Sequence, residues 1–132
     1  MKNKGLTLLE MLFALGVTTV ILVAMVAVMT RSLAASQYAR NKAVADSLVQ
    51  QGLEKAREVR DQAPDWGSFN QASVEAAIAT LPLPSPMASP IGVSWGTVDT
   101  GINQKKMVRI TVSWTDSKGT HSSEGTTYFA QW

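Results

Sequence analysis

One acidic side chain stands alone in a long apolar stretch near the start of the chain. Between residues 6 and 29 the only ionisable side chain is Glu10. An acidic residue inside a membrane is costly, and it normally pairs with a positively charged group. Glu10 is therefore the first candidate for a binding residue, and the chemistry that it predicts is ion pairing at or inside a membrane.

The rest of the sequence contains no pattern typical of catalysis or metal binding. His121 is the only histidine, so a histidine-based zinc site is not expected, and we interpret it as a surface residue. The chain has no cysteine, which excludes disulfides, thiolate metal sites and a cysteine nucleophile. Asp99, Asp116 and Glu124 are too scattered for a calcium loop. We expect no catalytic residue, no metal and no cofactor, and therefore a protein that is not an enzyme.

The charge balance also argues against nucleic acid as a partner. The formal net charge is +2, and Lys2 and Lys4 account for it. Beyond them, basic and acidic residues are equal in number. Nonspecific nucleic-acid binding depends on an excess of Lys and Arg that neutralises phosphates.

The apolar segment that must position Glu10 is longer than the roughly 20 residues that a membrane-spanning helix needs. Lys2 and Lys4 would hold the N-terminus in the cytoplasm and leave the C-terminal domain outside. One interpretation is a secretory signal peptide cleaved near "SLAAS" at residues 32–36, but the apolar run is too long for it and Arg31 precedes the site. A second is a simple membrane anchor that tolerates Glu10 near the interface. The third is a short leader that is removed while the apolar segment is kept.

The third interpretation rests on the stretch "KGLTLLEMLFALGV". It closely resembles the class III leader of type IV pilins and type II secretion pseudopilins, in which a basic leader ends in glycine and is followed by Phe, Thr, Leu, Leu or Ile, and Glu. Here the corresponding residues are Gly5, Leu6, Thr7, Leu8, Leu9 and Glu10. Leu6 stands where Phe is usual, and other apolar residues occur at that position in the family.

The resemblance implies a specific maturation and assembly. A prepilin peptidase would cut between Gly5 and Leu6, and the new amino group of Leu6 would be methylated. Glu10 would then be the fifth residue of the mature chain and, together with Thr7, would serve assembly by pairing with the N-terminal amine of a neighbouring subunit or of its own chain. Such pairing would offset the cost of the carboxylate when helices pack side by side. The partners implied are other pilin or pseudopilin subunits, the peptidase, the assembly platform proteins and the membrane.

The pattern after the apolar segment predicts that the same helix continues to about Gln62. No proline occurs before Pro64, and apolar residues recur at helical spacing on one face, at Val44, Leu48, Leu53, Ala56 and Val59. This amphipathic half is expected to cover a sheet. Major pilins often carry a proline in the first half of the helix, and its absence here suits a minor subunit.

Residues 63–90 are expected to form a connecting region. Asn70 or Ser73 is predicted to cap a short helix that runs to about Thr80, and the prolines that follow favour extended or turn structure. We expect Trp66 and Phe69 to pack on the long helix.

Three strands are predicted in residues 91–132. The clearest covers residues 107–114, where Val108, Ile110, Val112 and Trp114 alternate with polar residues. Residues 91–98 form a weaker candidate, and a third strand follows the turn "DSKG" at residues 116–119. The hairpin "VRITVSWTDSKG" with its return strand also looks like the C-terminal hairpin of minor pilins of the pilus modification type and of pseudopilins of the I type.

The expected fold class is α+β and pilin-like, with a long N-terminal membrane-spanning helix packed on a short antiparallel sheet. We expect a leader at residues 1–5, a membrane and assembly helix at residues 6–30, and a soluble domain at residues 31–132. The expected function is that of a minor type IV pilin or pseudopilin in a pilus, secretion or DNA-uptake system, located first in the inner membrane and then in the filament. The alternative is a membrane-anchored binding module or adhesin that uses its helix only as a tether.

Overall fold

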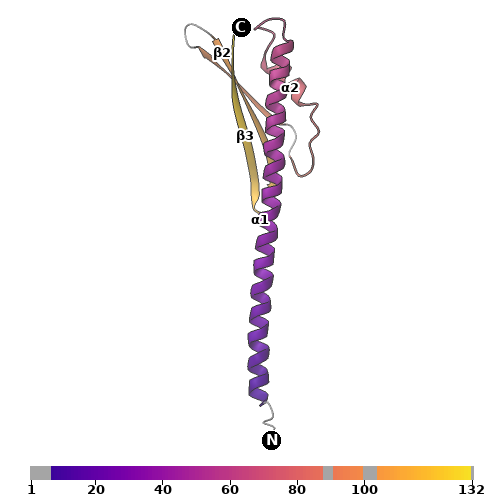
Figure 1. Cartoon of the computed structure of the whole chain (residues 1–132), viewed down its shortest axis with the longest axis vertical. Helices are drawn as coiled ribbons and strands as arrows, with labels where there is room; N and C mark the ends of the chain where they lie inside the picture. Colours follow the sequence, from indigo (N-terminus) through magenta and orange to yellow (C-terminus); the bar gives the residue numbers. More distant parts are fainter. Residues whose placement is uncertain (1–6, 88–90, 100–103, 132) are drawn as a thin grey trace. The chain divides into compact units, whose positions relative to one another are not determined.

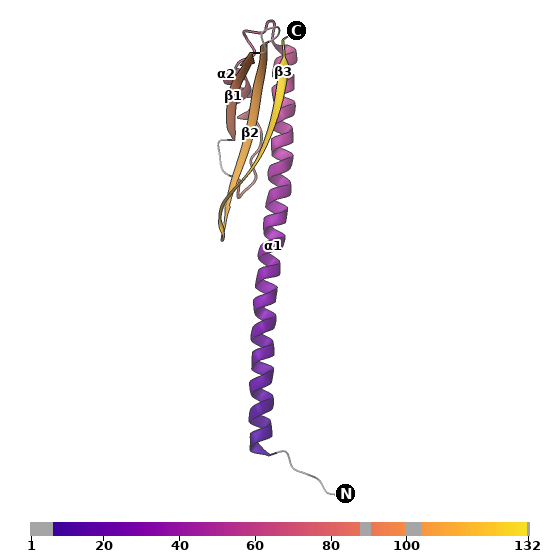
Figure 2. The same cartoon turned by 90° about the vertical axis from the view of Figure 1, so that its left-hand side faces the viewer.

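The computed structural model describes residues 7–87, 91–99 and 104–131 of the chain. Its elements are the helices α1 (Leu8–Gln62) and α2 (Gln71–Ile78), followed by the strands β1 (Gly92–Asp99), β2 (Gln104–Asp116) and β3 (Gly119–Ala130). The strands form one antiparallel sheet in the order β1-β2-β3, with β2 between its neighbours (Figures 1 and 2). The predicted α+β class, with one long apolar N-terminal helix and a three-stranded antiparallel sheet, is confirmed.

The chain divides into two compact units, one ending at Gln37 and the other beginning at Tyr38. The first unit contains the N-terminal turns of α1, where nearly every side chain is exposed. The second unit contains the remaining turns of α1, α2 and the sheet, and all of its buried apolar side chains form one core. The division lies within α1, a few residues after the expected boundary at residue 30.

The buried face of α1 consists largely of small residues. Its buried members are Ala45, Leu48, Val49, Gly52 and Ala56. Leu48 and Ala56 belong to the predicted stripe, whereas Val44, Leu53 and Val59 are half-buried at its margins. The buried face therefore differs in part from the predicted stripe. Alanine and glycine contribute little to an apolar pattern in the sequence, but their small size allows the sheet to approach the helix here.

Two glycines make this close approach possible. A Cβ added to Gly52 would lie 3.0 Å from Cγ2 of Ile110 in β2, and one added to Gly125 would lie 2.6 Å from Cγ1 of Val49. Contacts as short as the second are essentially never seen for a real Cβ atom, so a side chain at Gly125 would force β3 away from α1. At each of these two points, the backbone of one element therefore lies directly against an apolar side chain of the other.

The central strand β2 supplies most of the sheet side of the core. Val108, Ile110, Val112 and Trp114 are all buried, as the alternation predicted. The strand is longer than expected because it continues through Gln104–Lys106, where the polar residues hide the alternation. The turn after it is the predicted one, and Gly119 has a φ of 125°, which favours glycine.

The connecting region is organised by a capped helix and buried rings. Asn70 is the N-cap of α2, and its side chain and that of Ser73 form a reciprocal capping box. Phe69 is fully buried, and its ring lies 5.1 Å from the rings of Trp95 and Phe129, measured between centroids. These aromatic contacts join the connecting region to β1 and β3. The sequence had predicted that Phe69 packs on the long helix.

Candidate functional site

The candidate assembly site lies at the start of α1. The carbonyl oxygen of Thr7 accepts hydrogen bonds from the backbone N–H groups of Glu10 at 3.0 Å and Met11 at 3.2 Å. Thr7 therefore takes the N-cap position, and Glu10 is the third residue of the helix. The spacing Thr-x-x-Glu is that of a capping box, and an acidic residue in a first helical turn is favoured by the helix dipole. Sequence interpretation had assigned Thr7 and Glu10 to assembly and had not considered capping, with which their spacing is compatible.

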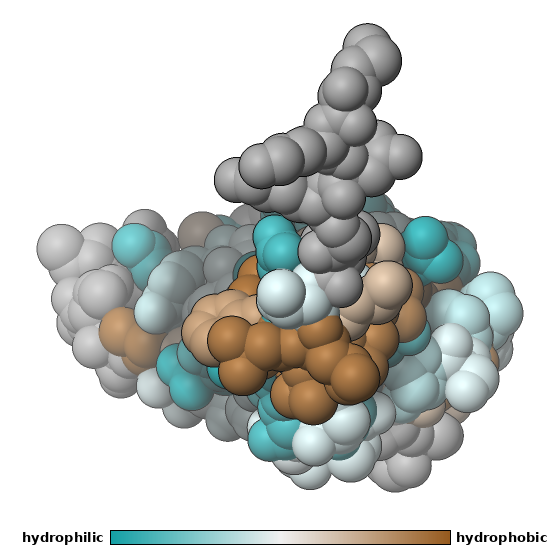
Figure 3. Space-filling view, turned by 90° about the horizontal axis from the view of Figure 1, so that it is seen from below, coloured by the Kyte–Doolittle hydropathy of each residue, from teal (hydrophilic) through white to brown (hydrophobic). Residues whose placement is uncertain are grey.

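The Glu10 carboxylate is exposed among apolar side chains. Within the part of the chain that the structure describes, no side chain pairs with it. Its neighbours Leu9 and Phe13 are also largely exposed, at 77% and 73%. Figure 3 views this end of the molecule, where hydrophobic side chains gather. The carboxylate is thus free to meet a cation that approaches from outside α1.

The apolar turns beyond Glu10 satisfy their own polar groups. The hydroxyls of Thr18 and Thr19 donate to the carbonyls of Ala14 and Leu15 at 2.8 and 2.7 Å, and Thr30 bonds back to Ala27 in the same way. Such back-bonded hydroxyls can enter lipid without leaving a donor unpaired. By length and composition, α1 is able to cross a membrane.

The remaining predicted site residues lie outside the described part of the chain. They are Lys2, Lys4, Gly5 and Leu6, which were assigned to orientation, cleavage and N-methylation. Their assignment rests on the sequence.

Among the residues of the second unit that the structure describes, Lys106 is a buried cation that sequence interpretation missed. Lys106 is only 9% exposed, and its Nζ donates to the carbonyl oxygens of Trp66 and Phe69. The same Nζ lies 4.4 Å from the centre of the Trp66 ring, close enough for a cation–π contact. Burial lowers the pKa of Lys106, while the charge of Asp65 acts in the opposite direction. Because these partners come from its own chain, Lys106 fastens the connecting region to β2 and is not a binding site.

His121 is half-buried in a small cluster, although a surface position had been expected. Its Nε2 lies 3.1 Å from Oδ1 of Asp116, and its ring packs edge-on against Tyr38 with 5.0 Å between centroids. The backbone N–H of Lys118 and the side chain of His121 hold the pKa of Asp116 below its ordinary value. Since Tyr38 belongs to α1, this cluster attaches the β2–β3 turn to the helix.

A polar contact also joins α1 to β3. Ser123 is buried, and its hydroxyl donates to the carboxylate of Asp46, which Lys42 also contacts at 3.3 Å. The hydrogen bond from Ser123, followed by the contact with Lys42, keeps the pKa of Asp46 below its ordinary value. The serine and the aspartate therefore satisfy each other at the edge of the core.

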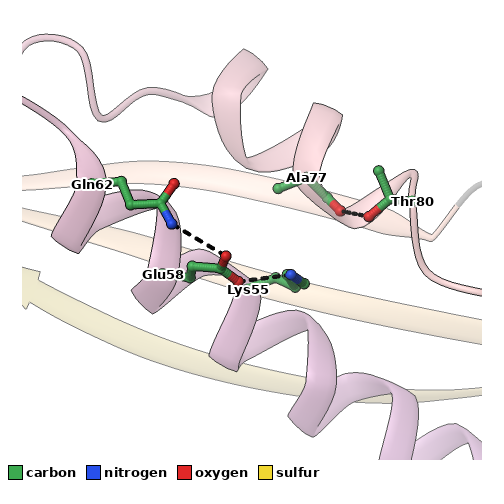
Figure 4. Close-up of polar contacts among 5 residues, drawn as sticks. All are labelled: Lys55, Glu58, Gln62, Ala77 and Thr80. Atoms are coloured by element: carbon green, nitrogen blue, oxygen red, sulfur yellow. Dashed lines mark hydrogen bonds and ion pairs between the residues drawn. The ribbon is translucent and has the colours of Figure 1, made fainter.

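An open groove of the second unit runs along α1 and reaches Leu81. Its charged side chains all have ion-pair partners on α1. Glu58 accepts from Lys55 at 2.7 Å and from Gln62 at 3.2 Å, whereas Thr80 bonds back to the Ala77 carbonyl of α2 (Figure 4). The first of these bonds holds the pKa of Glu58 below its usual value. The groove thus presents satisfied charges, and within the described residues no group of His, Cys, Asp and Glu could hold a metal ion.

Comparison with known proteins finds no family model, no curated protein and no solved structure that matches this chain.

Proposed function

We propose that this protein is a structural subunit of the minor type IV pilin or pseudopilin kind, and not an enzyme. It would be made with the leader of residues 1–5, cut by a prepilin peptidase before Leu6, methylated there and assembled into a pilus or secretion pseudopilus. Before assembly its N-terminus would lie in the cytoplasm, with the C-terminal domain outside the inner membrane.

The observation that carries the proposal is the exposed carboxylate of Glu10 in an otherwise apolar helix. On insertion scales an acidic residue at the bilayer centre costs about 2.5–3.5 kcal/mol. A protein that needed only an anchor would gain from replacing it with an apolar residue. A carboxylate with no partner among the described residues is, however, suited to bind the N-terminal amine of an adjacent subunit.

The position of Glu10 in the first turn of α1 offers a purely local reason for the same residue, because a glutamate there could cap the helix. A capping box accepts either Glu or Gln at this position, because the interaction is a hydrogen bond to the backbone. Ion pairing with an amine requires the negative charge. Glutamine therefore distinguishes the two roles, since it keeps the capping group and removes the charge.

The test compares Glu10→Gln and Glu10→Leu in cells that assemble the filament. Leader cleavage and membrane content are measured by blotting, and incorporation is measured in sheared filaments. We expect normal cleavage and membrane content in both variants, with incorporation lost or strongly reduced in both. Normal incorporation of Glu10→Gln with failure of Glu10→Leu would assign Glu10 to helix capping alone.

The alternative function is a membrane-anchored binding module or adhesin whose helix is a simple tether. This alternative is favoured by the length and composition of α1, which are sufficient for a membrane anchor whether or not the protein assembles into a filament. On that alternative both Glu10 variants would insert and function at least as well as the wild type, and the N-terminus would remain uncut at Met1.

A further inference from the structure

The outward face of the sheet carries an ordered pattern of charge on β2. Side chains alternate between the two faces of a strand, and Val108 and Ile110 are buried on the face that meets the core. Lys105, Met107 and Arg109 therefore share the opposite face, where the two cations are exposed and Met107 is half-buried. This face presents a cation, an apolar side chain and a second cation at alternate residues of one strand.

The apolar centre of the pattern extends onto the neighbouring strands. Met107 is opposite Gly96 in β1 and Tyr128 in β3. A Cβ added to Gly96 would lie 3.0 Å from the terminal methyl carbon of Met107, so the Met107 side chain lies over β1 at this point. Tyr128 on the other flank is 59% exposed. We name this surface the outer-face patch, and it consists of Lys105, Met107, Arg109 and Tyr128.

Both cations of the outer-face patch keep their charge available. Among the described residues, neither Lys105 nor Arg109 has a carboxylate within ion-pair distance. The Nε of Arg109 donates to the hydroxyl of Thr126 at 3.3 Å, which orients the guanidinium group without neutralising it. On α1, by contrast, Lys55 and Glu58 pair with each other. The patch is therefore suited to a partner that brings negative charge.

The spacing of the two cations specifies the shape of that partner. Lys105 and Arg109 are four residues apart in the strand, a distance of about 13 Å at roughly 3.3 Å per residue. Acidic residues four apart in a helix are separated by only about 6 Å along its axis. In an extended segment they are as far apart as the two cations, and the residue midway between them points to the same side. An extended segment with the order acidic, any, apolar, any, acidic therefore matches the outward residues of β2.

Glu124 limits how far the negative charge of the partner can extend. It is exposed in β3 opposite Thr111, which is the next outward residue of β2 after Arg109. A polymer that carries a charge on every unit, such as an acidic polysaccharide or a nucleic acid, would bring one of its charges toward this carboxylate. Like charges that face each other across an interface are unfavourable. A peptide can carry an uncharged residue there, so the patch favours two separate acidic residues over a uniform polyanion.

We propose that the outer-face patch binds an extended acidic segment of another protein. The two acidic residues pair with Lys105 and Arg109, and the apolar residue between them packs on Met107 and Tyr128. A single exposed ion pair contributes little, so recognition requires both ion pairs and the apolar contact together. The inference goes beyond the proposed function and does not depend on leader cleavage or on Glu10.

The experiment uses the full-length chain in micelles of an uncharged detergent and two synthetic peptides of the same composition. In "GDSFSDG" the aspartates are four residues apart with phenylalanine midway, and in "GDFSDSG" they are three residues apart. The phenylalanine of each peptide is a photoreactive derivative, and mass spectrometry measures the amount and the position of the cross-linked product. We expect several-fold more product from the first peptide, attached at Met107 or Tyr128.

Variants at exposed positions identify the groups responsible. Lys105→Gln and Arg109→Gln should each reduce the product from the first peptide several-fold. Lys118→Gln is the control, because it removes a cation from the exposed β2–β3 turn and should leave the product unchanged. Arg109→Glu should abolish the product, and "GKSFSDG", in which lysine replaces one aspartate, should restore it. Because all these side chains are exposed, the circular dichroism of the variants should match that of the wild type.

Three results would overturn the inference. One is equal product, or no product, from the two peptides. Another is a product that survives in both Lys105→Gln and Arg109→Gln. The third concerns the class of partner, because polygalacturonate or oligothymidylate that competes better than the first peptide without its photoreactive group, at equal charge concentration, would assign the patch to a polyanion.

Discussion

At the scale of single residues, the polar groups that matter most are those that join distant parts of the second unit. Lys106 binds the connecting region to β2, and Ser123 binds β3 to Asp46 of α1. Burying a polar group without a hydrogen-bond partner is costly, and both side chains find such partners within the chain. We expect their removal to weaken the domain without affecting any ligand.

The bond between Ser123 and Asp46 should make stability depend on pH in the acid range. The pKa of Asp46 is held below its ordinary value of 3.8 in the folded chain. The stabilisation is therefore present above that ordinary pKa and is lost as the pH falls through the lower folded value. Ser123→Ala should reduce the free energy of unfolding at pH 6, and the difference from the wild type should shrink by pH 3.

Urea unfolding of a fragment that starts at Thr30 would measure this effect. Ser122→Ala is the matched control, because Ser122 is exposed on the adjacent position of β3. A difference between wild type and Ser123→Ala that stays constant from pH 6 to pH 3 would contradict the assigned cause of the shift.

At the scale of elements, the helix and the sheet are held together by apolar burial on one face of α1. Leu48 is 4% exposed in this face. Leu48→Asp should lower the free energy of unfolding by about 3–5 kcal/mol, because it removes a buried side chain and places a charge among apolar neighbours. Gln50→Asp adds the same charge at an exposed position of α1 and should have little effect. Equal melting temperatures for Leu48→Asp and the wild type would show that this face is not buried.

Close contact between α1 and β3 gives a second prediction at this scale. Gly125→Ala should destabilise the domain by about 1–3 kcal/mol, since the new Cβ collides with Val49. Gly92→Ala is the control, because its Cβ would meet Thr111 at an ordinary 3.4 Å. Combining Gly125→Ala with Val49→Ala should cost less than the sum of the two single changes. Strict additivity in calorimetry would mean that the two residues do not touch.

Elements with a strong period could be predicted from the sequence, whereas contacts between them could not. The alternation of β2 identified its buried residues, and the two cap candidates Asn70 and Ser73 located the start of α2, because both signals are local. The role of Gly52 depends on the approach of Ile110, which is far away in the sequence. Lys106 was missed for the same reason, since its burial depends on carbonyl groups in the connecting region. At the candidate site, the N-cap position of Thr7 could have been recognised from its spacing to Glu10.

At the scale of the whole molecule, the proposed maturation makes a direct prediction about the N-terminus. A peptidase pocket that accepts only glycine before the cut should exclude any side chain at position 5. Gly5→Val should therefore accumulate as full-length precursor in the membrane, while the wild type yields a chain that begins with methylated Leu6. Mass spectrometry of the intact protein measures both. A start at Ala35 or Ser36 would instead indicate a signal peptide, and efficient cleavage of Gly5→Val would contradict a class III leader.

The contacts of the second unit differ in sequence separation, and this difference determines the order in which they can form. The β2–β3 hairpin closes through a short turn, but the bond between Ser123 and Asp46 joins residues 77 apart. Long loops cost more entropy to close, so the hairpin can form early and the helix–sheet contact must form late. During synthesis the buried face of α1 leaves the ribosome well before the strands that cover it. Until β3 arrives, Leu48 and Val49 remain exposed to water, and in that interval a holding chaperone would have an apolar helix to bind.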